Sequence, residues 1–124
     1  MSRDFGIVRP FFTIIALSCF LLCFSAPPSF ATPPERIEVR YSYPTQTLVV
    51  IITHESKRGN HYIKFVEVAK NGSIVGIHTY DSQPTVDRFT YVYKIPAMDD
   101  DTFEVTVICS RGDSKKSSVY TVRQ

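Results

Sequence analysis

The sequence predicts an all-β domain, a two-sheet antiparallel sandwich of short strands. From Thr32 onward, apolar residues recur at almost every second position, and no stretch of ten or more residues shows the 3.6-residue repeat of an amphipathic helix. Turn-forming Gly, Pro and Asn residues separate these alternating segments. The length of 124 residues leaves room for one small domain. It excludes a dinucleotide-binding fold of two halves and a (β/α)8 barrel.

The first 31 residues predict an export signal. Arg3 and Arg9 give a basic start, residues 11–24 form an apolar run, and Ser29-Phe30-Ala31 places small residues where a signal peptidase cuts. The run is shorter than the about 20 apolar residues that span a bilayer. We therefore expect cleavage after Ala31 and a periplasmic or secreted protein, with a retained N-terminal anchor as the alternative.

Three strands are expected in the first half of the remaining chain. Residues 36–41 alternate charged and apolar side chains, which is typical of a half-buried strand, and Pro44 ends it. Residues 46–53 contain a near-continuous apolar run and predict a central strand. After a polar loop over residues 55–60, a third strand is expected over residues 61–70.

Four more strands complete the predicted fold. Asn71-Gly72 is a strong hairpin signal, because both turn positions tolerate positive φ, and it leads into a strand over residues 73–80. Further alternating segments predict strands over residues 88–94, 102–109 and 117–123. Seven strands fit an immunoglobulin-like sandwich that lacks the cysteine pair and tryptophan of antibody domains. A small open barrel is the alternative.

The charge balance excludes several function classes. With 14 basic and 12 acidic residues, the net charge is +2, which indicates neither a nucleic-acid groove nor a polybasic membrane anchor. We therefore expect no nucleic-acid partner, and membrane contact only through the signal segment. No Gly-x-Ser-x-Gly motif is present, so nothing in the sequence supports serine hydrolysis.

Two histidines and one cysteine are the candidate metal ligands. His54 follows the predicted central strand and His61 begins the next one, so the short loop between them returns both imidazoles to one end of the sandwich. Cys109 ends a later strand and is the only cysteine left after signal cleavage. Imidazoles and a thiolate suit Fe, Cu or Zn rather than Mg or Ca. A solvated histidine pair and a buried, inert thiol are the competing interpretations.

These residues carry a resemblance to a known family. Residues 53–68 (THESKRGNHYIKFVEV), the Asn71-Gly72 turn and residues 105–109 (VTVIC) together resemble the iron domain of desulfoferrodoxin and neelaredoxin, the superoxide reductases. The similarity covers roughly Ile37 to Val122. It implies an immunoglobulin-like sandwich with a mononuclear non-haem iron, bound by four equatorial imidazoles and one axial thiolate. The open sixth position would take superoxide, a small anion, with electrons from a separate donor.

The sequence matches only part of this set of ligands. Only His54, His61 and Cys109 match the family pattern; Gly112 stands where the last histidine would be, and no histidine precedes His54. The loss of two imidazoles puts the reductase activity in question and favours Cu or Zn over ferrous iron. The catalytic residues are not identified. Lys57 and Arg58 either steer the anion or form a solvated loop.

A second function class stays open. The chain also resembles the immunoglobulin-like accessory subunit of the periplasmic sulfur-oxidation carrier complex, with a similar turn and strand over Gly112 to Val122. That resemblance implies a metal-free binding module whose sheet edges or loops hold a periplasmic protein partner.

Overall fold

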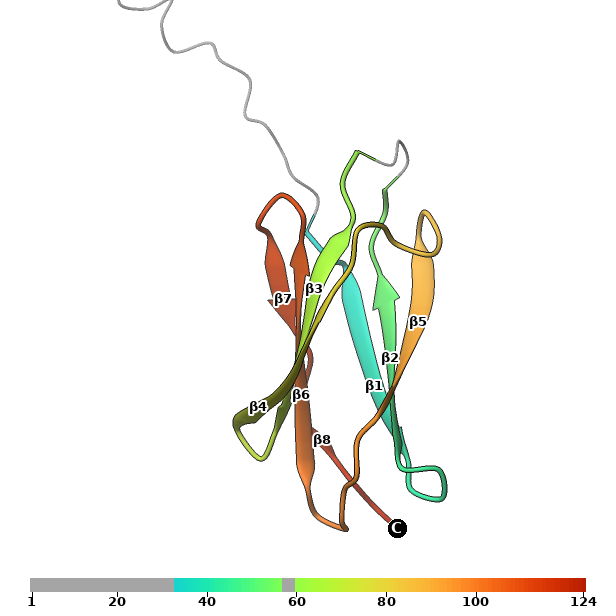
Figure 1. Cartoon of the computed structure of the whole chain (residues 1–124), viewed down its shortest axis with the longest axis vertical. Helices are drawn as coiled ribbons and strands as arrows, with labels where there is room; N and C mark the ends of the chain where they lie inside the picture. Colours follow the sequence, from blue (N-terminus) through green and yellow to red (C-terminus); the bar gives the residue numbers. More distant parts are fainter. Residues whose placement is uncertain (1–32, 57–59) are drawn as a thin grey trace, which may run out of the picture. The chain divides into compact units, whose positions relative to one another are not determined.

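The computed structural model describes residues 33–56 and 60–124, and it confirms the all-β antiparallel sandwich (Figure 1). One sheet has the strand order β1-β2-β5, and the other has the order β4-β3-β6-β7, with β8 also paired to β6. The strands are β1 (Arg36–Ser42), β2 (Thr47–Thr53), β3 (Ile63–Lys70), β4 (Ser73–Thr79), β5 (Arg88–Lys94), β6 (Thr102–Cys109), β7 (Ser114–Lys116) and β8 (Tyr120–Thr121). The predicted signal segment, residues 1–31, lies outside the described residues. No helix in the described ranges is long and apolar enough to cross a membrane.

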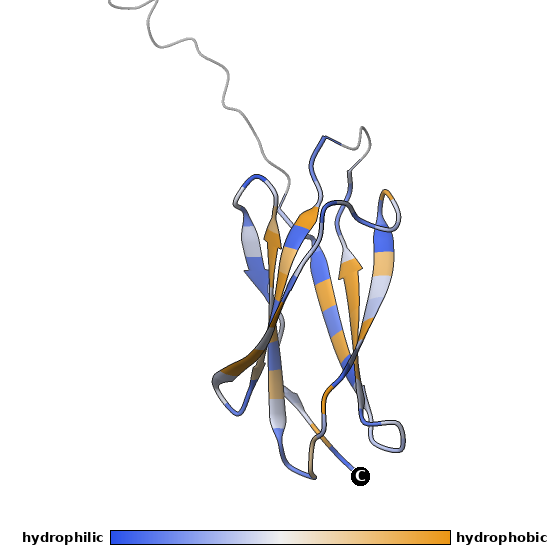
Figure 2. Ribbon diagram, in the orientation of Figure 1, coloured by the Kyte–Doolittle hydropathy of each residue, from blue (hydrophilic) through white to orange (hydrophobic). Residues whose placement is uncertain are grey.

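Period-two alternation builds the core. Strands β2 and β6 alternate strictly between buried and partly exposed positions. In Figure 2 β2 is nevertheless orange along most of its length, because its partly exposed positions are also hydrophobic. The buried apolar side chains of β2 and β6 belong to one core cluster. Between the two sheets Phe103 of β6 stacks on Tyr41 of β1, with ring centroids 5.4 Å apart. Because each large apolar side chain contributes about 1.5–3 kcal/mol when fully buried, this layer holds the sheets together.

The predicted hairpin at Asn71-Gly72 is confirmed. Asn71 (φ 52°) and Gly72 (φ 82°) both have positive φ, as a two-residue turn between twisted strands requires. The Asn71 side chain also bonds to the loop before β6: its Nδ2 donates to Asp101 Oδ1 and its Oδ1 accepts the Thr102 amide, both at 2.9 Å. The hairpin is thereby fastened to the β5–β6 connection.

Asp101 is expected to make stability depend on pH. The Met98 amide donates to Asp101 Oδ2 at 2.8 Å, and this bond, together with those from Asn71 and Lys70, lowers the pKa of the carboxyl below its usual value. A lowered pKa contributes stability above the ordinary carboxyl pKa, and this contribution is lost as the pH falls through the folded-state pKa. We therefore expect Asp101→Asn to lower the urea midpoint at about pH 7 and to change it little near pH 2. Equal effects at both pH values would contradict this account.

The predicted strand over residues 117–123 is confirmed only over Tyr120–Thr121. The structure has two short strands instead, β7 and β8, and both pair with β6. Ser117 interrupts the ladder: its backbone amide donates to Val105 O at 2.8 Å, and its buried hydroxyl accepts the Val105 amide at 2.9 Å. The hydroxyl replaces a backbone acceptor there, so the chain leaves regular pairing until Tyr120.

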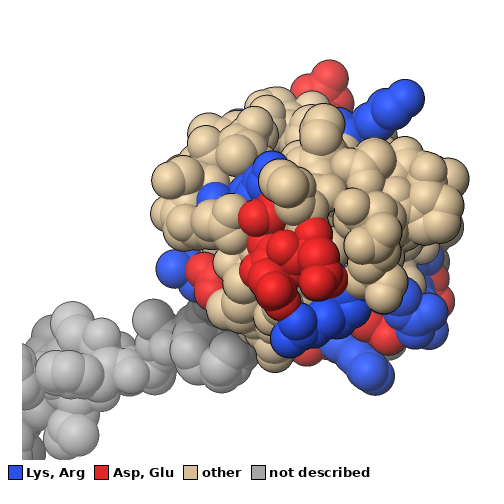
Figure 3. Space-filling model, turned by 90° about the horizontal axis from the view of Figure 1, so that it is seen from below, with Lys and Arg blue, Asp and Glu red and all other residues tan. Residues whose placement is uncertain are grey.

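Acidic side chains gather at the end of the molecule that carries the β5–β6 connection. Figure 3 shows Asp and Glu side chains forming one red patch on this face, with basic side chains beside it. The Asp100 carboxylate accepts a bond from Arg123, and Asp99 accepts the Gln124 amide at 3.0 Å. The acidic loop therefore holds the C-terminal residues. It lies at the end of the sandwich opposite to the β2–β3 loop (Figure 1).

Candidate metal centre

The structure brings His54 and His61 together at one end of the sandwich. His54 directly follows β2, and its amide donates to Asp87 O at 2.7 Å. His61 lies two residues before β3, and Ser110 donates to the carbonyl of the intervening Tyr62 at 2.7 Å. The two imidazole centroids are 4.8 Å apart, with the ring planes at 84°. The sequence-based expectation that the loop returns both rings to one end is confirmed.

Gln83 fixes the orientation of His54. The Gln83 side-chain nitrogen donates to His54 O and Thr85 O, at 3.0 and 2.8 Å, so its oxygen is the acceptor end of the amide. That oxygen lies 2.9 Å from His54 Nδ1, which must therefore carry the proton. In the neutral ring, Nε2 then holds the lone pair. The His54 side chain is fully buried, which keeps this orientation fixed.

His61 has the same arrangement. Its Nδ1 lies 2.9 Å from the side-chain oxygen of Asn60; in the tautomer with the proton on Nδ1, this nitrogen donates to that oxygen and Nε2 holds the lone pair. His61 Nε2 is buried and has no hydrogen-bond partner among the described residues. Burial lowers the pKa of His61, and the charges of His54 and Arg111 act in the same direction. The ring is therefore neutral at neutral pH, which is the form that binds metals.

The spacing of the two rings fits one shared ion. Two imidazoles bound through metal–nitrogen bonds of about 2.1 Å at a roughly tetrahedral angle hold their ring centroids about 5 Å apart. The observed 4.8 Å agrees with that value. Metal-binding histidines commonly donate their second ring N–H to an oxygen acceptor, which fixes tautomer and orientation. Gln83 and Asn60 supply such acceptors here.

Cys109 lies at the same end of the sandwich, at the end of β6, the strand paired with β3. It is a buried, free thiol, and its backbone pairs with Ile63. Within residues 33–56 and 60–124, no three His, Cys, Asp or Glu side chains form a group arranged to hold a metal. His78 stacks on Tyr93 of β5 instead, with centroids 4.0 Å apart. Lys57 and Arg58 lie outside the described residues.

Comparisons with known proteins do not name a family for this chain. No protein-family model matches it, and no curated protein does. The superoxide reductase resemblance therefore rests on the residues quoted above and stays a prediction.

The donors present do not reproduce the iron centre of the resembled family. That centre requires four imidazoles and a thiolate, whereas the chain contains three histidines and His78 is engaged elsewhere. Two neighbouring imidazoles, with ring centroids 4.8 Å apart, instead fit a smaller donor set, in which Cys109, water or a carboxylate would complete the coordination.

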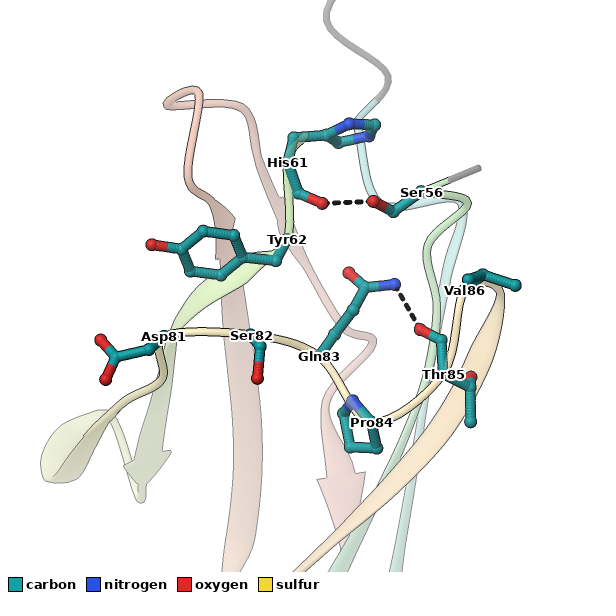
Figure 4. A pocket seen from close by; sticks show the side chains of 9 residues that line it. All are labelled: Ser56, His61, Tyr62, Asp81, Ser82, Gln83, Pro84, Thr85 and Val86. Carbon is teal, nitrogen blue, oxygen red and sulfur yellow. Dashed lines mark hydrogen bonds between the residues drawn. The ribbon is translucent and has the colours of Figure 1, made fainter. Parts of the chain in front are cut away.

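A pocket of ≈ 250 Å³ adjoins His61 (Figure 4). Its walls are Tyr62 on one side and residues 81–86 of the β4–β5 loop on the other, with Gln83 projecting between them. Ser56 closes the top, where its hydroxyl donates to the His61 carbonyl. The pocket therefore offers a mixed apolar and polar recess next to His61.

Sequence reasoning missed the residues that position the imidazoles. No prediction was made for Gln83, and Asn60 and Ser56 were interpreted only as members of a polar loop. Gln83 acts on His54 across 29 positions, and no local pattern signals such a bond. The one available sign was the position of Asn60 immediately before a histidine.

Proposed function

We propose that this protein is an exported metal-binding β-sandwich that holds one transition-metal ion between His54 and His61. The observation that carries the proposal is the 4.8 Å approach of two buried imidazoles, each with its Nδ1 bonded to a side-chain amide oxygen. Cys109 is the third donor in this proposal, because it is free, buried and at the same end of the fold.

The metal follows from the donor chemistry. Iron is the ion that the family resemblance implies, and a thiolate ligand would give its ferric form a visible charge-transfer band. Two imidazoles and one thiolate retain Cu or Zn better than ferrous iron, according to the general affinity order of divalent ions. Superoxide reduction is proposed only for the iron-bound form of the protein.

Metal analysis tests the proposal. The protein, purified from cells that express the full chain, is loaded anaerobically with ferrous iron, or separately with Zn²⁺, and its bound metal is counted per chain. We expect about one ion per chain, and an affinity about 100-fold lower in His61→Gln, because neither amide atom replaces a neutral imidazole nitrogen. His78→Gln is the matched control, since His78 stacks on Tyr93 away from the pair. Equal affinities in the two variants would reject the histidine pair as the site.

Cys109→Ser tests the third donor. We expect weaker binding of either ion and, in the iron form, loss of the thiolate band. If the iron content and the visible spectrum of this variant equal those of the wild type, Cys109 is not a ligand, and the histidine pair remains the proposed site. Urea unfolding of each variant separates loss of a ligand from loss of the fold.

A metal-free binding module is the second candidate function, and the pocket beside Tyr62 favours it. In that case the hydrogen bonds of Gln83 and Ser56 hold the loops that shape the recess. The metal analysis also distinguishes these two functions. If neither iron nor zinc binds the wild-type chain, the hydrogen bonds of His54 and His61 have a structural role only, and a partner that binds the pocket has to be identified.

A further inference from the structure

The recess between Tyr62 and the β4–β5 loop has the size of a small-molecule site. Its ≈ 250 Å³ is several times the about 30 Å³ that one water molecule occupies in the liquid, and it lies just below the range of about 300–1,000 Å³ for drug-sized ligands. In Figure 4 the ring of Tyr62 lies on one side and residues 81–84 lie on the other. The imidazole of His61 lies above the hydrogen bond from Ser56 and points away from these residues (Figure 4). The recess therefore has room for a ligand of several non-hydrogen atoms.

Most polar side chains that line the recess already have hydrogen-bond partners in the protein. The Ser56 hydroxyl donates to the His61 carbonyl, and the Thr85 hydroxyl donates to the Arg88 carbonyl at 2.6 Å. Both ends of the Gln83 amide are bonded, its oxygen to two N–H groups and its nitrogen to two carbonyls. These bonds hold the walls of the recess in place.

The carboxylate of Asp81 is the exception. It has no hydrogen bond or ion pair with any residue in the ranges 33–56 and 60–124. Within the same ranges, no lysine or arginine lines the recess. In Figure 4 this carboxylate and the Tyr62 hydroxyl point toward the same side, whereas the Ser82 hydroxyl points away from Tyr62. One side of the recess therefore carries a negative charge that no lining cation neutralises.

The opposite side of the recess is apolar. Pro84 and Val86 line it there, and neither has a polar side chain (Figure 4). An ammonium group is favoured where a carboxylate accepts its N–H bonds and an aromatic face lies within about 6 Å. Asp81 supplies such a carboxylate and Tyr62 such a ring. The recess thus combines a side that attracts cations with a side that attracts apolar groups.

We propose that the recess binds a small organic cation, an ammonium group carried on a short apolar chain. The ammonium group lies at Asp81 and Tyr62, and the chain lies against Pro84 and Val86. A ligand carboxylate is repelled by Asp81, and a neutral alcohol gains no ionic attraction there. The proposal gives a ligand class to the metal-free binding module, and it does not require a metal ion at the histidine pair.

A titration with three matched probes tests this inference. The purified protein, freed of metal with a chelator, is titrated at neutral pH and constant ionic strength with n-butylammonium, n-butanol or butyrate, and amide chemical shifts are followed by NMR. We expect n-butylammonium to shift the amides of Tyr62 and of residues 81–86, with a dissociation constant in the millimolar range, because an ion pair open to solvent contributes little. We expect n-butanol to bind about 3–5-fold more weakly and butyrate to cause no saturable shift.

Asp81→Asn tests the residue that attracts the cation. We expect this variant to bind n-butylammonium about 3–5-fold more weakly, with an affinity close to that for n-butanol. Asp87→Asn is the matched control, because it removes the same charge from the same loop at a residue that does not line the recess. Its side-chain oxygen remains able to accept the Arg88 amide, as the Asp87 carboxylate does at 2.7 Å. We expect this control to bind n-butylammonium like the wild type.

Three results would overturn the inference. The first is that n-butylammonium leaves the amides of Tyr62 and residues 81–86 unshifted. The second is that n-butanol or butyrate binds as tightly as n-butylammonium, which would indicate a site without charge selectivity. The third is an equal loss of affinity in the two asparagine variants, which would indicate a general effect of net charge. Because the titrated protein contains no metal, these results and the metal analysis of His61→Gln can fail independently.

Discussion

Phe103→Ala should lower the free energy of unfolding by about 3–5 kcal/mol. Phe103 is among the largest fully buried side chains of the described residues, and its ring stacks on Tyr41 of the opposite sheet. Truncation removes the burial of the ring and leaves a cavity between the two sheets, where the strand ladders limit collapse. Urea unfolding followed by tyrosine fluorescence measures the change.

Phe65→Ala is the control for Phe103. Phe65 lies on the neighbouring strand β3 but is only partly buried, with Lys64 Nζ 5.3 Å from its ring centroid. Its truncation therefore leaves no enclosed cavity, and we expect a clearly smaller loss of stability. If both truncations cost the same, the layer between the sheets would not be the main source of stability.

The fold was accessible from sequence because most strands have one buried face. Over residues 102–109 the alternation alone identifies the buried face, and the structure buries Phe103, Val105, Val107 and Cys109 there. The same reasoning failed after β6. Ser117, a polar residue, is buried and takes a ladder position through its hydroxyl, which a hydrophobicity pattern cannot register.

Only part of the candidate site could be predicted from the sequence. The loop from His54 to His61 is short and limits the distance between the two rings. Their proximity could therefore be predicted from the sequence. Cys109 was placed at the right end of its strand, but its distance from the histidines depends on how the two sheets stack. The orientation of the His54 ring depends on Gln83, which reaches it from a different loop. Such contacts follow from tertiary packing, which leaves no periodic signal in the sequence.

The hydrogen bonds of Gln83 link the stability of the end of the sandwich that carries His54 and His61 to the proposed metal binding there. One side chain joins the end of β2, the start of β3 and its own loop, through His54, Ile63 and Thr85. The Ile63 amide donates to the same oxygen as His54 Nδ1, at 3.2 Å. A change at this position is therefore expected to alter unfolding and ligand binding together.

Gln83→Ala should destabilise the protein by about 2–5 kcal/mol, because it leaves two buried donors, the Ile63 amide and His54 Nδ1, without this acceptor at about 1–3 kcal/mol each. Under the metal proposal it should also weaken binding about 10–100-fold, since His54 loses the partner that fixes its tautomer. Urea unfolding and metal titration measure the two effects on the same preparations.

Gln83→Glu separates the two roles of this side chain. A carboxylate keeps an acceptor for His54 Nδ1 and Ile63 but cannot donate to the His54 and Thr85 carbonyls. We therefore expect it to lose stability while retaining more metal affinity than the alanine variant. Ser82→Ala, in the same exposed loop, is the control and should leave both quantities unchanged. Metal affinity that stays at the wild-type value in Gln83→Ala would mean that His54 needs no positioning partner, and would count against His54 as a ligand.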